Sequence, residues 1–496
     1  MVDFPINRPW ELVIAGTDEQ RLMGHLFPGG GHEHGAVILA GVHVLHNRVR
    51  LLVRDVILAE DGVDHVVGPR GYLMLRAQFI HSHVTRARDE RLIYLSVHNH
   101  GGSNRVEFSG TDLSSHERGY PTLLDLVQGM PVGALVFARS AIAGDIWLPG
   151  ETRVRLKQAT VVGRSRAVLR PAPIQVSQKT ALSIYDRQVR LFGEAGQHIL
   201  AATKVGIIGL GGIGSQLAEL LGRLGVGSFV LIDPERADLT NLPRLIAARR
   251  SDVLMSEETA LKFGPLSFWF SRLRRRKVDL AARNILRANR SAHVERVFGS
   301  ILDQHVAERL LDCDYLFLAA DSMAARLVFN AVVYQYLIPG IQVGARVVAD
   351  EETGSVTDVF VVSRPVMPHG GCLWCNSLIN TNKLQTEATA QTQARAQDYG
   401  TGSPAPSVIT LNALAAAEAV NTFQFYMTGL ASSETCDGYY RFQPMKRAVT
   451  IDEPRADEAC TECGRHATSR FARGDGAHPH SAGTRDREPD GSIQTV

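Results

Sequence analysis

The segment Lys204-Val205-Gly206-Ile207-Ile208-Gly209-Leu210-Gly211-Gly212-Ile213-Gly214-Ser215 carries the clearest structural pattern in the sequence. Its first five residues form a short apolar run typical of a buried strand, and residues 216–224 have the spacing of an amphipathic helix. A strand, a Gly-x-Gly-x-x-Gly turn and a helix in this order let backbone N–H groups and a helix N-terminus hold phosphate. Asp233 ends the next predicted strand, residues 229–232, where a carboxylate suits ribose hydroxyls.

Charged residues further along the chain favour ATP over a nicotinamide dinucleotide. The glycine turn alone fits an NAD-dependent Rossmann oxidoreductase, which we keep as an alternative. However, Arg244 and Lys277 follow the turn, and Asp321 closes a predicted strand at residues 315–318. Cations neutralise the charge of transferring phosphoryl groups and a carboxylate can hold magnesium, whereas an uncharged nicotinamide ring needs neither.

With these residues, and with residues 185–193 and 240–244, the chain resembles the ThiF/MoeB family over positions 183–466. That family is the adenylyltransferase core shared with ubiquitin-activating enzymes. The resemblance implies a Rossmann-like parallel-sheet domain that uses ATP and Mg²⁺ to adenylate the C-terminal glycine of a ubiquitin-like protein. It assigns Gly209, Gly211, Gly212 and Gly214 to the phosphate loop, Asp233 to the ribose, Asn241, Arg244 and Lys277 to the phosphates, and Asp321 to magnesium.

The same resemblance predicts partners. Arg187 matches an Arg-Gln motif whose arginine reaches into the active site of the other subunit, so a homodimer is expected. A conjugating enzyme or a sulfur carrier is a possible recipient of the activated protein. Residues 249–276 form an insertion with aromatic residues and a basic run. It is either a solvated basic helix or a docking element, and it leaves Lys262 as an alternative to Lys277.

Two Cys-x-x-Cys pairs, Cys372/Cys375 and Cys460/Cys463, predict a structural zinc site with four thiolate ligands. Their separation requires the fold to bring the pairs together. A thioredoxin-like redox pair is the alternative, but it leaves the second pair unexplained. Cys313, beside an apolar strand, is interpreted as a core residue.

Relatives that pass the activated protein to a thiol carry a cysteine after the first zinc pair, and residues 376–430 contain none. Cys436 is interpreted as an ordinary loop cysteine, with a thiol carrier as the alternative. The chain is therefore expected to stop at the acyl-adenylate.

A second pattern lies upstream. Residues 92–97 form a predicted buried strand that leads into His98-Asn99-His100. Residues two apart on a strand face the same side, so both imidazoles can reach one ion. Asp112, in the segment Ser109-Gly-Thr-Asp112, offers a third ligand. Two histidines and one carboxylate leave a fourth position open for water, as catalytic zinc requires.

Together with Glu33, which precedes the apolar residues 35–39, this pattern resembles the JAB/MPN (JAMM) zinc metalloprotease family. The resemblance implies that His98, His100 and Asp112 ligate zinc, that Glu33 is the general acid/base, and that Ser109 stabilises the oxyanion. Glu60 is another upstream carboxylate, and Gly101 stands where the family has proline. An inactive member of the same fold is the alternative.

These patterns divide the chain into a JAB/MPN-like α/β domain (1–168), a proline-restricted linker (169–182), the ThiF/MoeB-like domain (183–466) and a disordered tail (467–496). The net charge of +2 gives no general attraction for nucleic acid. Neither a secretory nor a membrane-spanning pattern is present, so a cytoplasmic protein is expected.

The sequence thus predicts a bifunctional enzyme of a bacterial ubiquitin-like system. One half activates the C-terminal glycine of a ubiquitin-like protein, and the other cleaves after that glycine, either to process a precursor or to remove conjugates. A catalytically inactive scaffold is the non-enzymatic alternative.

Overall fold

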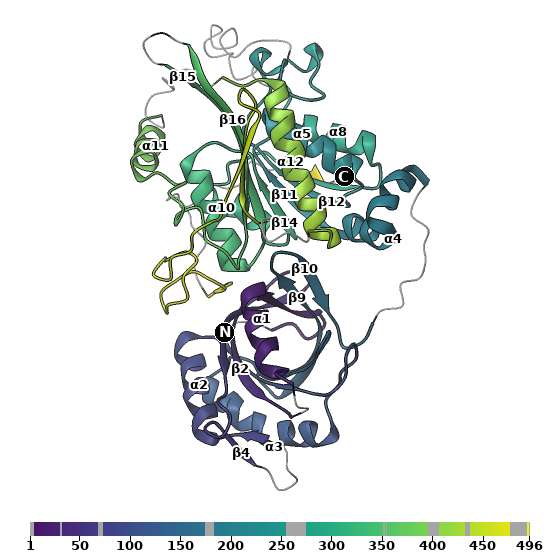
Figure 1. Ribbon diagram of the computed structural model, residues 1–496, viewed down its shortest axis with the longest axis vertical. Coiled ribbons are helices and arrows are strands. Elements are labelled where there is room, and N and C mark those ends of the chain that lie inside the picture. The colour runs from purple at the N-terminus through teal and green to yellow at the C-terminus, as the bar shows by residue number, and fades with distance from the viewer. Residues whose placement is uncertain are drawn as a thin grey trace. The chain divides into compact units, whose positions relative to one another are not determined.

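The computed structural model describes residues 4–29, 32–67, 73–173, 183–253, 274–350, 353, 355–394, 406–431, 437–476 and 494–495. The chain forms two compact units, each built on one large sheet with helices (Figure 1). The first unit comprises Met1–Gln178, Tyr334–Leu337 and Asp457–His478, and the second comprises the remainder. Every helix in the described ranges is too short or too polar to act as a membrane-spanning segment.

The first unit contains an eight-stranded mixed sheet in the order β1-β3-β2-β6-β7-β8-β9-β10. Because β1 also pairs with β9, the sheet curls round on itself. The strands are β1 (Trp10–Ala15), β2 (Gly35–Val44), β3 (Val49–Leu58), β6 (Ile93–Asn99), β7 (Val132–Ala138), β8 (Ala141–Leu148), β9 (Thr152–Val162) and β10 (Arg166–Leu169). The helices are α1 (Gly16–Leu26), α2 (Ala77–Glu90) and α3 (Gly110–Val127), and β4 (His65–Val67) pairs with β5 (Leu73–Leu75).

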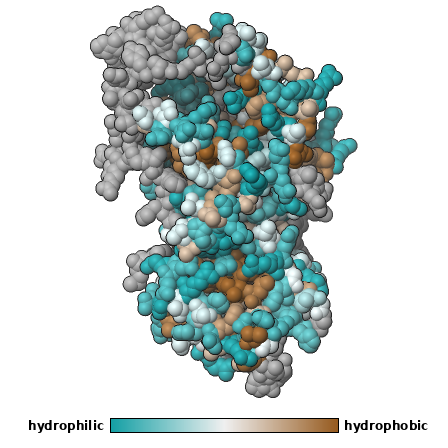
Figure 2. Space-filling model, turned by 60° about the vertical axis from the view of Figure 1, so that its left-hand side comes forward, coloured by the Kyte–Doolittle hydropathy of each residue, from teal (hydrophilic) through white to brown (hydrophobic). Residues whose placement is uncertain are grey.

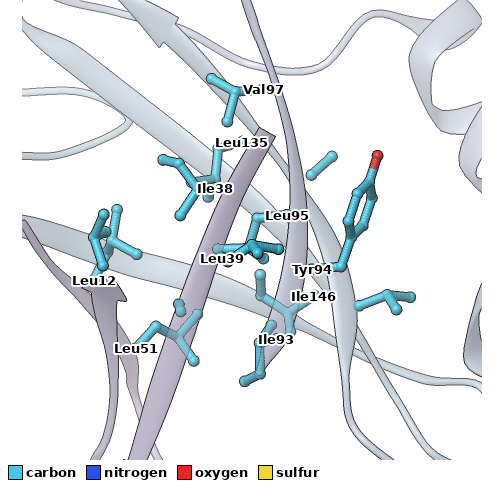
Figure 3. Packing of buried hydrophobic residues seen from close by; sticks show 14 of the residues in the cluster. Leu12, Ile38, Leu39, Leu51, Ile93, Tyr94, Leu95, Val97, Leu135 and Ile146 are labelled. Atoms are coloured by element: carbon cyan, nitrogen blue, oxygen red, sulfur yellow. The ribbon is translucent and has the colours of Figure 1, made fainter. Parts of the chain in front are cut away.

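The core of this unit forms between neighbouring strands of the curled sheet. Figure 3 shows Leu12 of β1 and Leu51 of β3 beside Leu39 of β2 and Leu95 of β6. The β6 strand is buried on both faces over Ile93–Leu95, as predicted from its unbroken apolar run. A strand fixed in this way delivers His98 and the residues that follow it to a defined position.

Residues 467–476 differ from the predicted disordered tail. Phe471 and Ala472 are fully buried in the first unit, and Asp475 accepts hydrogen bonds from the Val44 backbone N–H and from His43. Composition misled the prediction, because a polar segment is ordered here by contacts to residues distant in sequence rather than by a core of its own. The remainder of the predicted tail lies outside the described residues apart from 494–495.

Arg54 of β3 holds this C-terminal segment. Its guanidinium donates to the carbonyl oxygens of Phe471 and His466, the latter at 2.7 Å, and its side chain is 1% exposed. Burial, and secondarily the nearby Arg473, lower the pKa of Arg54 to about 10, so it stays charged at neutral pH. A charged group is tolerated in this position because backbone carbonyls and Glu90 surround it.

The second unit contains a nine-stranded sheet in the order β18-β17-β16-β15-β14-β11-β12-β13-β19. The strands β13, β12, β11, β14 and β15 run parallel, as predicted, whereas β16, β17 and β18 extend the sheet in antiparallel fashion. The bounds are β11 (Lys204–Ile208), β12 (Ser228–Ile232), β13 (His293–Val297), β14 (Tyr315–Leu318), β15 (Gly340–Ala349), β16 (Val356–Val366), β17 (Tyr439–Gln443), β18 (Ala448–Asp452) and β19 (Gln494–Thr495).

The main helices of this unit are α4 (Asp186–Ala202), α5 (Gly212–Arg223), α8 (Lys277–Ala288), α10 (Met323–Tyr336), α11 (Thr381–Ala394) and α12 (Ile409–Thr428). The short helices η1 (Ser183–Tyr185), η2 (Leu239–Asn241), η3 (Arg250–Asp252), α9 (Gln304–Ala307) and η5 (Glu308–Leu310) complete the set. The helices α4, α5, α8 and α12 pack together (Figure 1). Cys313 is fully buried beside β14, which confirms its interpretation as a core residue.

Apolar side chains are not confined to the cores. On the face drawn in Figure 2 hydrophilic residues predominate, and apolar residues gather in a few small groups. Among the exposed large apolar residues, Val449 and Ile451 lie on the edge strand β18, and Met445 lies in the preceding turn.

Replacing Arg54 by methionine is expected to destabilise the first unit by about 2–3 kcal/mol, because the His466 and Phe471 carbonyls lose their charged donor. Urea denaturation and limited proteolysis of the 465–475 segment measure the effect. The control is Arg88→Met, which removes an exposed arginine that pairs with the adjacent Asp89. Equal stability of the two variants would contradict the assigned role of Arg54.

Candidate functional site

In the glycine turn of the second unit, two backbone segments lie very close to each other. Gly209 has φ +87°, and its N–H donates to the Ile232 carbonyl at 2.9 Å. A Cβ at this position would lie within 3.0 Å of backbone atoms of Ala319 and Ala320. A Cβ on Gly214 would overlap the Gly209 carbonyl oxygen. Glycine is required at both positions, because neither leaves room for a Cβ atom and Gly209 also has a left-handed backbone conformation.

Helix α5 begins at Gly212, inside the glycine motif, rather than at residue 216 as predicted. No side chain caps its first turn. The first N–H groups of a helix lack partners within the helix and carry a partial positive charge. The turn therefore offers the phosphate-binding arrangement that the sequence pattern indicates.

Asp233 stands at the end of β12 and is 5% exposed. Its carboxylate accepts hydrogen bonds from the Leu210 N–H at 2.6 Å and the Glu235 N–H at 2.8 Å. Burial raises the pKa of Asp233, and the positive charge of Lys277 opposes that shift. The residue predicted to bind ribose thus also fixes the glycine turn, which the sequence reasoning missed.

Two of the three residues predicted to contact the phosphates, Arg244 and Asn241, lie on the segment that follows β12. Arg244 lies at the turn: its Cδ is 3.5 Å from the point that a Cβ atom would occupy if residue 212 had a side chain. Its guanidinium donates to the Thr240 carbonyl at 3.2 Å. Asn241 is one half of a capping box with Asp238, accepting from the Asp238 N–H at 3.2 Å.

Lys277, by contrast, is buried and ion-paired with Glu235, a partner that the sequence reasoning did not identify. The Lys277 N–H also donates to the Glu235 carbonyl at 3.1 Å. This pair keeps the ammonium near Asp233. Lys262, the alternative, lies outside the described residues, as do residues 254–273 of the insertion and Cys436.

Asp321 follows β14 on the other side of the turn. The chain leaves β14 through Ala319, whose N–H donates to the Ile208 carbonyl at 2.8 Å. Asp321 is exposed at the start of the segment that leads into α10. An exposed carboxylate is available to a cation, and the magnesium role of Asp321 remains a prediction.

Two further residues complete the surroundings. Asn412 of α12 is 2% exposed, and its side chain occupies the space that a Cβ atom on residue 212 would need. It therefore packs directly against the glycine turn. No sequence motif indicates this contact, because α12 is remote from the turn along the chain. Arg187 is exposed in the first turn of α4, and its role towards a second subunit remains a prediction.

The four predicted zinc-binding cysteines lie together. The sulfur atoms of Cys372, Cys375, Cys460 and Cys463 are all within 4.8 Å of one another. Backbone N–H groups of Cys375 and Glu462 point at the Cys372 and Cys460 sulfur atoms, each at 3.4 Å. Four thiolate donors at this spacing fit a tetrahedral zinc ion, whose Zn–S bonds are about 2.3 Å long.

In the first unit, the side chains of His98, His100 and Asp112 also meet. The two Nε2 atoms are 3.2 Å apart, and Asp112 carboxylate oxygens lie 3.6 Å from that of His98 and 3.3 Å from that of His100. This donor set of two imidazoles and one carboxylate fits catalytic zinc. The Glu107 carbonyl lies 3.1 Å from His100 Nδ1 and orients the ring.

The electrostatics of this cluster are coupled. The hydrogen bond to Asp112 raises the pKa of His100, against the effect of burial. Burial raises the pKa of Asp112, but the hydrogen bonds from His100 and His98 outweigh it and hold that pKa well below its usual range. The carboxylate is therefore ionised and ready to accept a cation.

Glu33 and Ser109 both reach the cluster. Glu33 Oε1 lies 3.9 Å from His100 Nε2, which favours Glu33 over Glu60 as the carboxylate beside the imidazoles. Ser109 is the N-cap of α3 and forms a capping box with Asp112. Its hydroxyl donates to the Asp112 carboxylate at 2.7 Å. The Ser-x-x-Asp spacing thus has a structural cause, helix capping, in addition to the predicted chemistry.

The chain is similar to known proteins over residues that lie mostly in the second unit. Residues 185–464 match the sequence model of the ThiF family. The tRNA threonylcarbamoyladenosine dehydratase of Escherichia coli (strain K12) is 27% identical over 156 residues, which are 31% of this chain and 51% of that protein. The sulfur carrier protein ThiS adenylyltransferase of Bacillus subtilis (strain 168) is 28% identical over 158 residues, 31% of this chain and 41% of that protein.

Among solved structures, E. coli MccB in complex with MccA-N7isoASN aligns with a TM-score of 0.43 at 19% identity, over 57% of this chain and 76% of that one. The chain spans about half or less of the length of the two curated relatives. The family match, however, covers more than half of the 496 residues. The chain therefore belongs to the ThiF family.

Proposed function

We propose that the second unit adenylates the C-terminal glycine of a ubiquitin-like protein in a bacterial ubiquitin-like system, using ATP and Mg²⁺. One observation carries this proposal. The Arg244 side chain lies next to Gly212, where α5 begins, and the start of α5 is beside the segment that leads to Asp321. Similarity to a sulfur carrier protein adenylyltransferase supports a carrier protein as the substrate. Membership of the ThiF family favours this reading over an NAD-dependent oxidoreductase.

In the proposed reaction, a carboxylate oxygen of the terminal glycine attacks the α-phosphorus of ATP. The bond from that phosphorus to the bridging oxygen breaks, and pyrophosphate leaves with the bond's electron pair. Arg244 and the N–H groups at the start of α5 would stabilise the charge that develops on the phosphoryl oxygens. Asp233 would hold the ribose, Asn241 and Lys277 would contact the phosphates, and Asp321 would hold Mg²⁺, which neutralises the charge of the leaving pyrophosphate.

The chain would act as a homodimer in which Arg187 reaches the active site of the partner subunit. The four-cysteine cluster would hold a structural zinc ion. A conjugating enzyme or a sulfur carrier would then receive the acyl group, since the described residues after Cys375 add no thiol before Cys460.

We further propose that the first unit is a JAB/MPN-type zinc hydrolase that cleaves after the same glycine. The support is the cluster of His98, His100 and Asp112 with Glu33 at its edge. Zinc bound by these residues would supply a water acidified to a pKa of about 7. Glu33 would accept a proton at its carboxylate and return it to the leaving amine. Ser109 would exchange its bond to Asp112 for one to the substrate oxyanion.

The two activities are chemically complementary, because adenylation requires a free C-terminal carboxylate and hydrolysis after glycine generates one. The hydrolase either matures a precursor or removes the mark from conjugates. An inactive scaffold, which would neither exchange pyrophosphate with ATP nor cleave a substrate, is the competing interpretation.

Replacing Asp321 by alanine is expected to lower ATP–pyrophosphate exchange more than 100-fold, because the proposed magnesium ligand is lost. Exchange is measured with ubiquitin-like proteins encoded beside this gene as acceptors of the adenylate. Proteolysis by the first unit should be unchanged. Asp452→Ala, at an exposed position of β18, is the control. Loss of both activities in Asp321→Ala would count against two independent sites.

Replacing His98 by alanine is expected to lower the zinc content from two ions per chain to one and to abolish cleavage, because one of the proposed zinc-binding imidazoles is removed. Elemental analysis of the purified chain measures the first effect. Exchange between ATP and pyrophosphate should persist. His81→Ala, an exposed histidine of α2, should leave both zinc ions in place. A wild-type chain with one zinc ion would refute the catalytic site.

Cleavage specificity distinguishes the two proposed uses of the hydrolase. A precursor with residues beyond the glycine and an isopeptide conjugate of the same ubiquitin-like protein are incubated separately with the zinc-loaded chain, and the product masses are recorded. Cleavage of the tailed precursor alone indicates maturation, and cleavage of the conjugate alone indicates removal. Resistance of both substrates would refute the proposed hydrolase activity.

A further inference from the structure

The residue between the two proposed zinc-binding histidines is buried and makes polar contacts of its own. Asn99 is the last residue of β6 and is 6% exposed. Its side-chain oxygen accepts a hydrogen bond from the His34 N–H at 2.6 Å. Its side-chain nitrogen donates to the His32 carbonyl at 3.3 Å. The two bonds reach the residues on either side of Glu33.

Sheet register explains why Asn99 meets this segment. The β2 and β6 strands are antiparallel, with Gly35 opposite His98. Continuing that register by one and two residues sets His34 opposite Asn99 and Glu33 opposite His100. The described β2 strand, however, begins only at Gly35. The Asn99 side chain therefore bonds to the chain just before β2, where the described strand pairing has not yet begun.

The position of Glu33 depends on these contacts. Its side chain is 44% exposed, and its carboxylate oxygen Oε1 lies 3.9 Å from His100 Nε2. An exposed carboxylate on a short segment samples several positions unless its backbone is held. The backbone on both sides of Glu33 is held by one buried side chain, which belongs to the same strand end as His98.

We propose that Asn99 is a positioning residue that holds the Glu33 backbone against the His98–His100 pair. This inference rests on the proposed hydrolase function. Asn99 does not contact the proposed ion or the substrate in this role. It fixes the distance between the proposed general acid/base and the proposed metal ligands, and small errors in such distances lower rates strongly.

The first test is kinetic. In zinc-loaded Asn99→Ala, kcat for cleavage of a ubiquitin-like precursor or conjugate should fall about 10- to 100-fold, while KM and zinc content stay at wild-type values. Asn99→Asp keeps the oxygen that accepts from His34 but loses the donor to His32, so its loss should be intermediate. Asn7→Ala, an exposed asparagine of the same unit, should be neutral.

A double-mutant cycle separates positioning from general destabilisation. If Asn99 acts through Glu33, Asn99→Ala should cause no further loss of kcat in a Glu33→Ala background. An equal further loss there would overturn the proposal. A fall in zinc content to that of His98→Ala would overturn it as well, because Asn99 would then support the metal site itself.

The last test needs no catalysis. Hydrogen–deuterium exchange of the peptide that contains Glu33 and His34 is compared in wild type and Asn99→Ala, both zinc-loaded and after chelation. The proposal predicts faster exchange at this peptide in the variant, with wild-type exchange at β7. Unchanged exchange would refute the contact. If the wild-type chain cleaves nothing, the proposed hydrolase fails while this measurement still decides whether Asn99 holds the segment.

Discussion

The second unit depends on the closeness of two backbone segments. At Gly209 the end of β11 passes within contact of Ala319 and Ala320 at the end of β14, and only a residue without a side chain can do so. The same passage brings the start of α5 beside the segment that leads to Asp321. The buried Asp233 carboxylate fixes the turn through the Leu210 N–H. The proposed nucleotide site thus lies at three strand ends, and backbone N–H groups hold its Asp233 carboxylate.

In the first unit, a strand end and a helix cap hold the residues of the proposed zinc site. There, a strand buried on both faces, β6, carries His98 to the edge of the curled sheet, and the cap of helix α3 fixes Asp112. The cap is strong because Ser109 and Asp112 satisfy each other's backbone N–H groups. Both proposed sites therefore lie where regular elements begin or end, which is where unpaired backbone groups and projecting side chains are available.

Local sequence patterns predicted those parts of the molecule that local physics determines. The β11–turn–α5 unit, the buried β6 strand and the closeness of the four cysteines followed from apolar runs, glycines and ligand spacing. Contacts between distant segments could not be predicted in this way. Asn412 over the glycine turn, Glu235 on Lys277 and the antiparallel strands β16 to β18 depend on how the chain folds back, and no short motif encodes that. The ordered segment around Phe471 is a further case, because its composition is that of a disordered tail.

The first unit is not a continuous stretch of the chain. Its buried Arg54 is satisfied by carbonyl oxygens of residues 466 and 471, more than four hundred positions later. During synthesis, therefore, the N-terminal sheet emerges from the ribosome with a charged side chain whose partners have not yet been translated. That sheet can reach its final packing only after residues 466–471 have been made, so a segment made late completes a fold that began early.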